Sequence, residues 1–160
     1  MKPPQQSEDF PDAFYRVTAK GLYVRDGKVL LIQNYSDQKG ITEWELPGGG
    51  VDFGETFHTT ITREVHEEMG LEVTWIDEKP SYIWTTRSGS GRGMEWYYVM
   101  TALYRIELRN LNFTPTAECQ NIGFFSKRDL RDSLKDLSAQ VAPLAEAFDP
   151  TLFSEKLERA

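Results

Sequence analysis

A segment of 23 residues, Gly49 to Leu71, constrains the fold of this chain more than any other part of the sequence. Its apolar residues recur every four positions, the spacing that places side chains on one face of an α-helix: Phe57, Ile61, Val65 and Met69. The hydroxyl of Thr56 can cap the first turn, and Gly70 stands where a left-handed residue commonly ends a helix. The sequence therefore predicts a helix between Thr56 and Gly70 with this stripe buried.

Three glutamates lie on one face of the same predicted helix. Glu64, Glu67 and Glu68 are spaced i, i+3 and i+4, so their carboxylates project within about one turn of each other. Glu68 also lies nearly in line with Ile61, beside the stripe that faces the core. Two unit charges about 5 Å apart repel by roughly 3 kcal/mol at an effective dielectric of about 20. A hard divalent metal would compensate this charge, although the spacing alone is also typical of a solvated acidic face.

The residues around these acids complete a longer pattern. A predicted strand at 44–47 and three glycines precede the helix. The specified residues are Gly49, Glu55, Arg63, Glu64, Val65, Glu67, Glu68, Gly70 and Leu71. The pattern resembles the Nudix box, Gly-x5-Glu-x7-Arg-Glu-aliphatic-x-Glu-Glu-x-Gly-aliphatic, at every specified position. This resemblance implies an α/β fold, a single-domain Nudix-type α/β/α sandwich around a mixed β-sheet, and hydrolysis of a nucleoside diphosphate linked to another moiety.

The resemblance also implies a metal site. Mg²⁺ or Mn²⁺ would be bound by the carbonyl of Gly48 and by the carboxylates of Glu64, Glu67 and Glu68. In similar proteins a carboxylate just before a later strand completes the metal site or acts as the base, and Glu118 occupies that place here. The other interpretation of Glu118 is a solvated loop acid. Glu64 or Glu118 would accept the proton of the attacking water.

Other residues of the box hold its shape under the same resemblance. Arg63, grouped with the catalytic residues, would pair with Glu55 and hold the loop against the helix, and Gly49 and Gly70 would have structural roles. A buried pair of this kind orients groups more than it stabilises them. His66 occupies an unspecified position on another side of the helix, and we interpret it and His58 as surface residues.

Length and charge limit the alternatives. The chain has 160 residues, enough for one domain, which we place at 13–160 after a polar tail at 1–12. A net charge of −7 argues against broad binding of nucleic-acid polymers or anionic membranes. The expected partner is a small-molecule nucleotide, and a homodimer is left open. The single cysteine, Cys119, is interpreted as structural or incidental and not as a nucleophile. The tail has no apolar leader, so we expect a cytoplasmic location.

A polyphosphate substrate would need local cations in so acidic a protein. Lys20 interrupts a predicted strand, either as an outward or edge residue or as a cation that reaches a substrate phosphate. Arg87 and Arg92 flank a glycine-rich segment, which is either a plain hairpin loop or a mobile loop that brings both arginines to phosphates. These three residues are our candidates for substrate binding.

The rest of the chain is predicted from strand and turn signals. An Asp26-Gly27 turn joins strands, and Asn34 to Thr42 is expected to be a polar loop. The predicted strands lie at 14–24, 28–33, 72–76, 81–86, 96–104 and 121–126. A helix is expected at 127–134, and another within 137–157, interrupted near Pro143 or Pro150.

The substrate is the least constrained part of the prediction. Positions 85 to 87 lack the proline or tyrosine that marks the ADP-ribose and dinucleoside polyphosphate subfamilies, which favours a nucleoside triphosphate or a nucleotide sugar. Three alternatives are open. They are an isopentenyl diphosphate isomerase, for which Cys119 lies in no matching motif, a non-catalytic nucleotide-sensing module, and an acidic interaction protein.

Overall fold

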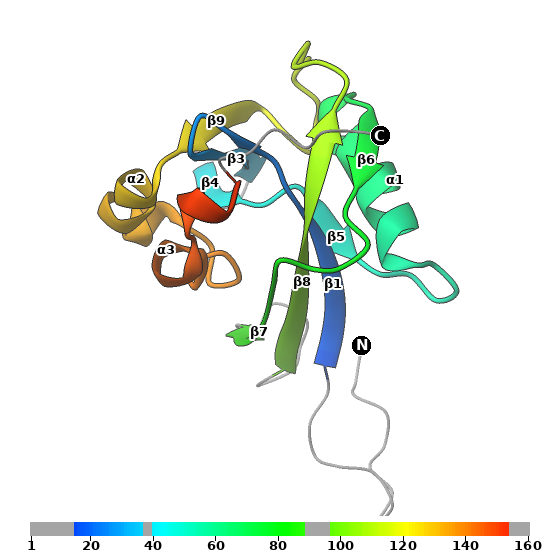
Figure 1. Cartoon of the computed structure of the whole chain (residues 1–160), viewed down its shortest axis with the longest axis horizontal. Helices are drawn as coiled ribbons and strands as arrows, with labels where there is room; N and C mark the ends of the chain where they lie inside the picture. Colours follow the sequence, from blue (N-terminus) through cyan, green and yellow to red (C-terminus); the bar gives the residue numbers. More distant parts are fainter. Residues whose placement is uncertain (1–14, 37–39, 89–96, 154–160) are drawn as a thin grey trace, which may run out of the picture.

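The computed structural model describes residues 15–36, 40–88 and 97–153, which form strands and helices of an α/β protein (Figure 1). The strands are β1 (Tyr15–Leu22), β2 (Val24–Arg25), β3 (Lys28–Ser36), β4 (Gly40–Glu45), β5 (Gly48–Gly50), β6 (Val73–Ile76), β7 (Tyr82–Ser88), β8 (Tyr97–Leu108) and β9 (Asn121–Phe125). The helices are α1 (Phe57–Met69), α2 (Lys127–Asp132), η1 (Leu134–Asp136), α3 (Leu144–Ala147) and η2 (Pro150–Phe153). The predicted α/β class is confirmed.

The strands form two sheets. The larger sheet has the order β5-β1-β8-β6, and β7 pairs with the first half of β8. β1 and β8 run parallel while the other pairs are antiparallel, so this sheet is mixed, as predicted. In the second sheet β3 pairs with β9 on one side and with β2 and β4 on the other. Asp26 and Gly27 have φ angles of 52° and 73°, which confirms the predicted tight turn between β2 and β3.

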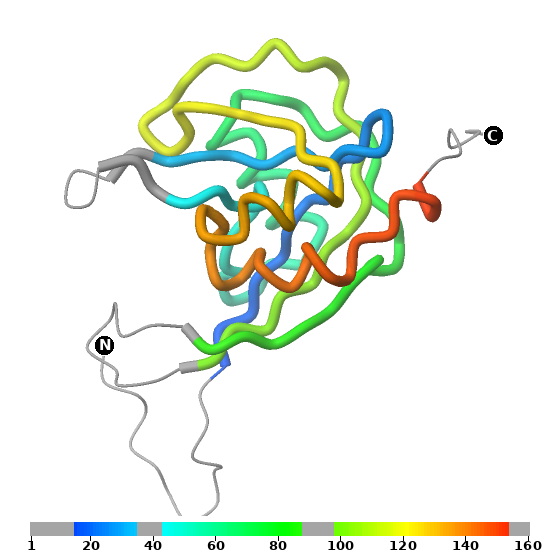
Figure 2. Tube along the Cα trace, turned by 90° about the vertical axis from the view of Figure 1, so that its left-hand side faces the viewer, coloured from blue at the N-terminus to red at the C-terminus, as the bar shows by residue number. Residues whose placement is uncertain are grey.

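Helices lie on both sides of the strands. In Figure 1 α1 lies to the right of β1, β5 and β8, and α2 and α3 lie to their left. Figure 2, seen from the left, shows the segment from α2 to η2 running past the strands. One buried cluster joins α1 to the sheets through Ile61, Val65 and Ala102, and a second joins Leu130 and Leu144 to the opposite side. This is the predicted α/β/α arrangement.

Helix α1 matches the predicted helix at both ends. The Thr56 hydroxyl accepts a hydrogen bond from the Thr59 N–H, and the Thr59 hydroxyl accepts one from the Thr56 N–H, which completes a capping box. Gly70 has the left-handed φ of 66°. Ile61, Val65 and Met69 are fully buried. Burial of this stripe fixes the rotation of α1 and thereby the directions of its glutamates.

One predicted loop is wrong, and the predicted C-terminal helix is short. Asn34 to Thr42 is not one loop, because β3 continues to Ser36 and β4 begins at Gly40. Pairing between the two strands supplies hydrogen-bond partners to a backbone whose side-chain pattern is polar. The described part of 137–157 contains the short helix α3, which follows Pro143, and η2, which begins at Pro150, so the predicted helix and its interruption near these prolines are confirmed.

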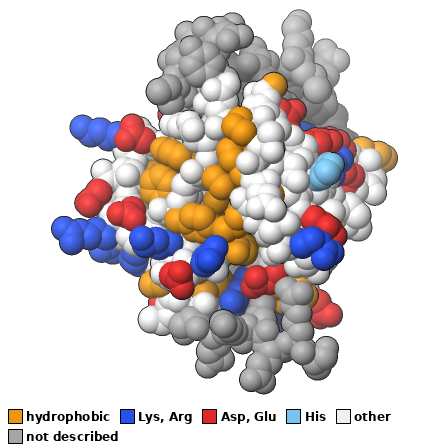
Figure 3. Space-filling view, turned by 90° about the horizontal axis from the view of Figure 1, so that it is seen from above, with side chains coloured by type: hydrophobic (Ala, Val, Ile, Leu, Met, Phe, Trp, Pro, Cys, Tyr) orange, Lys and Arg blue, Asp and Glu red, His pale blue; other side chains and the backbone are white. Residues whose placement is uncertain are grey.

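The surface carries charges of both signs. Seen from above, hydrophobic side chains gather in the middle of one face, and acidic and basic side chains lie beside each other around them (Figure 3). On this face the acidic side chains therefore do not form a single patch, although the chain has a net charge of −7. Among the residues that the structure describes, no helix has the length and apolar character that crossing a membrane requires.

Candidate active site

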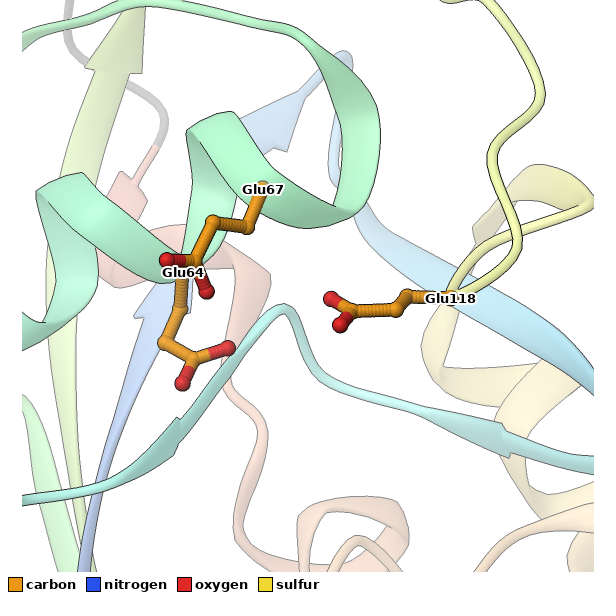
Figure 4. Close-up of side chains that lie close together, drawn as sticks. All are labelled: Glu64, Glu67 and Glu118. Atoms are coloured by element: carbon orange, nitrogen blue, oxygen red, sulfur yellow. The ribbon is translucent and has the colours of Figure 1, made fainter.

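Three carboxylates meet beside the middle of α1. Glu64 and Glu67 project from the helix, and Glu118 reaches toward them from the loop before β9 (Figure 4). One oxygen of each side chain lies within 4.8 Å of the others. Glu64 is partly buried, with 19% of its side chain exposed, whereas Glu67 and Glu118 are exposed. The structure therefore brings together two predicted ligands and the predicted base, from segments about 50 residues apart in the sequence.

Arg63 holds the helix, the preceding loop and two of these acids together. Its Nε and Nη2 donate to the two oxygens of Glu55, each at 2.9 Å, which confirms the predicted pair. Its Nη1 donates to Glu64 at 2.9 Å and to Glu67 at 3.2 Å, and Asp52 lies 3.4 Å from Nη2. The bond from Arg63, followed by that from the Asp52 N–H, lowers the pKa of Glu55 to about 2. One guanidinium thus fixes the orientations of several carboxylates.

Glu68 is buried and is not one of the three glutamates that meet within 4.8 Å. The residue is 6% exposed, and its Oε1 accepts a hydrogen bond of 2.8 Å from the Gly48 N–H. Burial raises the pKa of Glu68 to about 8. The Lys20 charge and the Gly48 bond oppose this shift, and the negative charges of Glu64 and Glu118 add to it. Glu68 therefore ties α1 to the glycine strand β5.

Two glycines of β5 allow the close approach of this strand to its neighbours. Gly48 has a φ of +132°, and a Cβ there would overlap the carbonyl oxygen of Ala19. At Gly49 a Cβ would lie 2.8 Å from Oε1 of Glu64. Side chains at either position would push β5 away from β1 or from the Glu64 carboxylate. Glycine is required at both positions because the neighbouring atoms leave no room for a Cβ.

Lys20 lies inside the protein. Its strand β1 is paired on both sides, and the residue is 6% exposed, so the interpretation as an outward or edge residue is wrong. Its Nζ donates to the carbonyls of Leu46 at 3.3 Å and Gly48 at 3.2 Å. The lysine stem fits because Gly48 has no side chain, since a Cβ there would lie 3.0 Å from the Lys20 Cδ. A phosphate contact of Lys20 stays a prediction.

The loop that carries Glu118 is fastened to α1 and β3. The Thr116 hydroxyl donates to the Glu68 carbonyl at 2.7 Å, one of the carbonyls that a helix end leaves without a helical partner. The same hydroxyl accepts from the Glu118 N–H at 3.2 Å, and the Gln120 N–H donates to the Gln33 carbonyl at 2.9 Å. These bonds hold the backbone of Glu118 beside the helix.

Comparison with known proteins assigns this arrangement to a family. The family model described as NUDIX domain matches residues 15–148. The chain belongs to the NUDIX domain family. It is 46% identical to the CTP pyrophosphohydrolase of Escherichia coli (strain K12) over 52 residues, which are 31% of this chain and 37% of that protein. It is 38% identical to a MutT-like protein of Streptomyces ambofaciens over 79 residues, 49% of this chain and 47% of that protein.

The chain thus spans less than half the length of each of these two relatives. A solved structure, the E. coli ORF135 protein, covers 92% of this chain with 96% of its own length, at a TM-score of 0.67 and 23% identity. At this identity the similarity concerns the fold. It agrees with the Nudix-type sandwich that the sequence pattern implied.

Other predicted residues lie outside the Nudix carboxylate cluster. Arg87 is exposed on β7, opposite Tyr98 of β8, and Arg92 falls outside the described residues. His66 is exposed, as interpreted. His58 is half-buried, with its Nε2 2.9 Å from the Asp77 carbonyl, so the interpretation as a surface residue is incorrect for it.

Cys119 is fully buried, and burial raises the pKa of its thiol to about 11. A thiol with so high a pKa is largely protonated near neutral pH and is a poor nucleophile. The interpretation of Cys119 as a structural residue agrees with this environment.

Two residues that contact the Nudix box in the folded chain were not predicted from the sequence. Thr116 anchors the Glu118 loop, and nothing in its sequence surroundings signals this. Arg16 lies against Gly50 of β5. A signal for Arg16 did exist, because the polar residues Arg16, Thr18 and Lys20 alternate with the period of a strand and so share one face of β1.

Proposed function

We propose that this chain hydrolyses a pyrophosphate linkage within a nucleotide, with Mg²⁺ or Mn²⁺ as cofactor. The observation that carries the proposal is the meeting of Glu64, Glu67 and Glu118 within 4.8 Å. Carboxylates this close repel one another unless a cation balances them. Arg63 contacts Glu64 and Glu67, but among the described residues no cation pairs with Glu118. The cluster therefore has an uncompensated negative charge.

The donor set suits a hard divalent cation. All three ligand groups are carboxylates, whose oxygens Mg²⁺ and Mn²⁺ prefer. Glu67 and Glu118 are exposed, so the site is open to water and to a substrate. When bound, such an ion neutralises phosphate oxygens and stabilises the leaving group. The three glutamates are its proposed ligands.

Gly48 and Glu68 remain in the proposal as further oxygen donors. The Gly48 carbonyl accepts from Lys20, and one oxygen of Glu68 accepts from the Gly48 N–H. A carbonyl oxygen has two lone pairs and a carboxylate has a second oxygen, so each keeps the capacity for another partner. In this proposal they extend the site toward β5.

The protein's own groups position the reactants. Glu64 or Glu118 accepts the proton of the water that attacks a phosphorus of the bridge, and the bond from that phosphorus to the bridging oxygen breaks. One oxygen of Glu64 bonds to Arg63, while the described residues offer the Glu118 carboxylate no hydrogen-bond partner. Arg63 contributes by holding Glu64 and Glu67 in fixed directions while Glu55 holds Arg63.

The proposed substrate is a small-molecule nucleotide in the cytoplasm, either a nucleoside triphosphate or a nucleotide sugar. The name of one relative, a CTP pyrophosphohydrolase, supports the triphosphate, although the matched region is only 31% of this chain. Lys20, Arg87 and Arg92 stay in the proposal as cations that contact the substrate. Lys20 would have to contact the substrate with the same ammonium that donates to the Leu46 and Gly48 carbonyls.

A substrate panel tests the proposal. Hydrolysis of nucleoside triphosphates, nucleotide sugars, ADP-ribose and dinucleoside polyphosphates is measured with Mg²⁺, with Mn²⁺ and with EDTA. We expect metal-dependent turnover of one class, lost in Glu64→Gln and kept in Glu78→Gln, an exposed acid outside the cluster. Nucleotide binding without any turnover would overturn the proposal and favour a nucleotide-sensing module.

A further inference from the structure

Arg16 of β1 reaches over the glycine strand β5. The register pairs Thr18 with Gly50, and the Arg16 side chain crosses to this glycine from the neighbouring position on the same face of β1. A Cβ on Gly50 would overlap the Arg16 Nη2 and would lie 2.5 Å from its Cζ. The guanidinium can occupy this place only because residue 50 has no side chain.

Among the residues that the structure describes, the charge of Arg16 has no partner. Within the described residues, no acceptor lies at hydrogen-bond distance from its guanidinium and no carboxylate lies at salt-bridge distance, although the side chain is half-buried. Arg63 and Arg109, in contrast, both hold carboxylates. A partly desolvated charged donor without an acceptor is unfavourable. This side chain is therefore a good donor for an anion from outside the protein.

The residues nearest to Arg16 on its face of the sheet carry no charge. On its face of the sheet its neighbours are Thr18 of β1, Val99 and Thr101 of β8, and Gly50. The hydroxyls of Thr18 and Thr101 bond to each other at 3.0 Å. No acid among these neighbours competes for the guanidinium, in a protein with a net charge of −7.

Arg16 and the carboxylate cluster lie on opposite faces of one short strand. The Cβ direction of Gly49 meets the Glu64 carboxylate, and that of Gly50 meets the Arg16 guanidinium. Successive strand residues face opposite sides and their Cα atoms are about 3.8 Å apart, so the two charged groups are separated by roughly 10 Å or less. β5 is the outer strand of its sheet, so a polyphosphate chain could pass its edge and meet both.

We propose that Arg16 binds a phosphate group of the substrate that is not held at the carboxylate cluster. This inference rests on the proposed function and names the phosphate contact of the same site. Lys20 shares the face of Arg16, but its ammonium is occupied by two carbonyls. The planar guanidinium offers several N–H donors to the oxygens of one phosphate.

The test measures binding of methylenediphosphonate, a pyrophosphate analogue whose bridging carbon prevents hydrolysis, by calorimetry in Mg²⁺ buffer. Arg16→Gln should weaken binding by about tenfold or more, the scale of a lost charged hydrogen bond. Arg25→Gln removes the same charge from an exposed site on β2 and should change affinity by less than about twofold. Equal affinities of the wild type and Arg16→Gln, or no binding by the wild type, would overturn the inference.

A second variant tests the same contact from the other side. Gly50→Ala keeps the guanidinium but places a methyl group where its Nη2 lies. It should weaken analogue binding in the wild type and have little further effect in Arg16→Gln, because the two changes remove one interaction. Additive losses would overturn the inference. Because no turnover is needed, a failure of the substrate panel remains distinguishable from a failure here.

Discussion

Glu68 should make the stability of this protein decrease as the pH rises. The residue is 6% exposed, and its pKa is raised from 4.5 to about 8, mainly by burial. The folded state therefore holds the proton more tightly than the unfolded chain does. The stabilisation is complete below about pH 4.5 and is lost as the pH rises through about 8. Glutamine at this position has a similar shape and cannot titrate.

The expected size follows from the two pKa values. One pKa unit corresponds to about 1.36 kcal/mol, so roughly 2.5 kcal/mol of stability should be lost through Glu68 between pH 5 and pH 7. This is a large fraction of the roughly 5–15 kcal/mol by which domains are stable. Glu68→Gln should therefore gain about this amount relative to the wild type over the same interval, while its Oε1 still accepts from the Gly48 N–H.

The assay is urea unfolding in EDTA at both pH values. Met69→Leu serves as the control, because it changes a neighbouring buried side chain without a titratable group and should have the same effect at both. A stability difference between the wild type and Glu68→Gln that does not change with pH would refute the reasoning. It would mean that Glu68 is solvated or charge-balanced in solution.

Two further predictions concern the supports of the site. Gly48→Ala should destabilise the fold by about 3 kcal/mol or more, since the methyl would overlap the Ala19 carbonyl at a φ of +132°. Gly54→Ala, at a φ of +90° with open space around it, should cost only about 1 kcal/mol in the same unfolding assay, and equal costs would contradict the contact argument. Glu55→Gln should lower kcat by about tenfold or more because Arg63 loses its charged anchor, and an unchanged kcat would contradict this role.

Local patterns allowed the sequence to predict the central helix and its acids. The spacing of Ile61 and Val65 and the caps at Thr56 and Gly70 lie within one short segment, so no tertiary information was needed. The Asp26-Gly27 turn was predictable for the same reason. The boundaries of β3 and β4 were not, because a polar segment becomes a strand when a partner strand supplies its hydrogen bonds.

Contacts across the sheet were beyond sequence reasoning. The burial of Lys20 depends on β1 being paired on both sides, and the place of Arg16 depends on Gly50 lying opposite it. Glu68 was expected beside the core-facing stripe, but its bond to the Gly48 N–H was not expected. Such features depend on which strands become neighbours, and the amino-acid pattern of one strand does not carry that information.

The measurement that tests the account most directly is calorimetric titration of Mn²⁺ into the wild type, Glu118→Gln and Glu78→Gln. Glu118 is far from Glu64 and Glu67 in the sequence and lies beside them only in the folded chain. Glu78 is an exposed acid on another loop. The account predicts binding by the wild type, affinity weaker by about tenfold or more in Glu118→Gln, and unchanged affinity in Glu78→Gln. Equal Mn²⁺ affinity in all three proteins would contradict the proposed metal site.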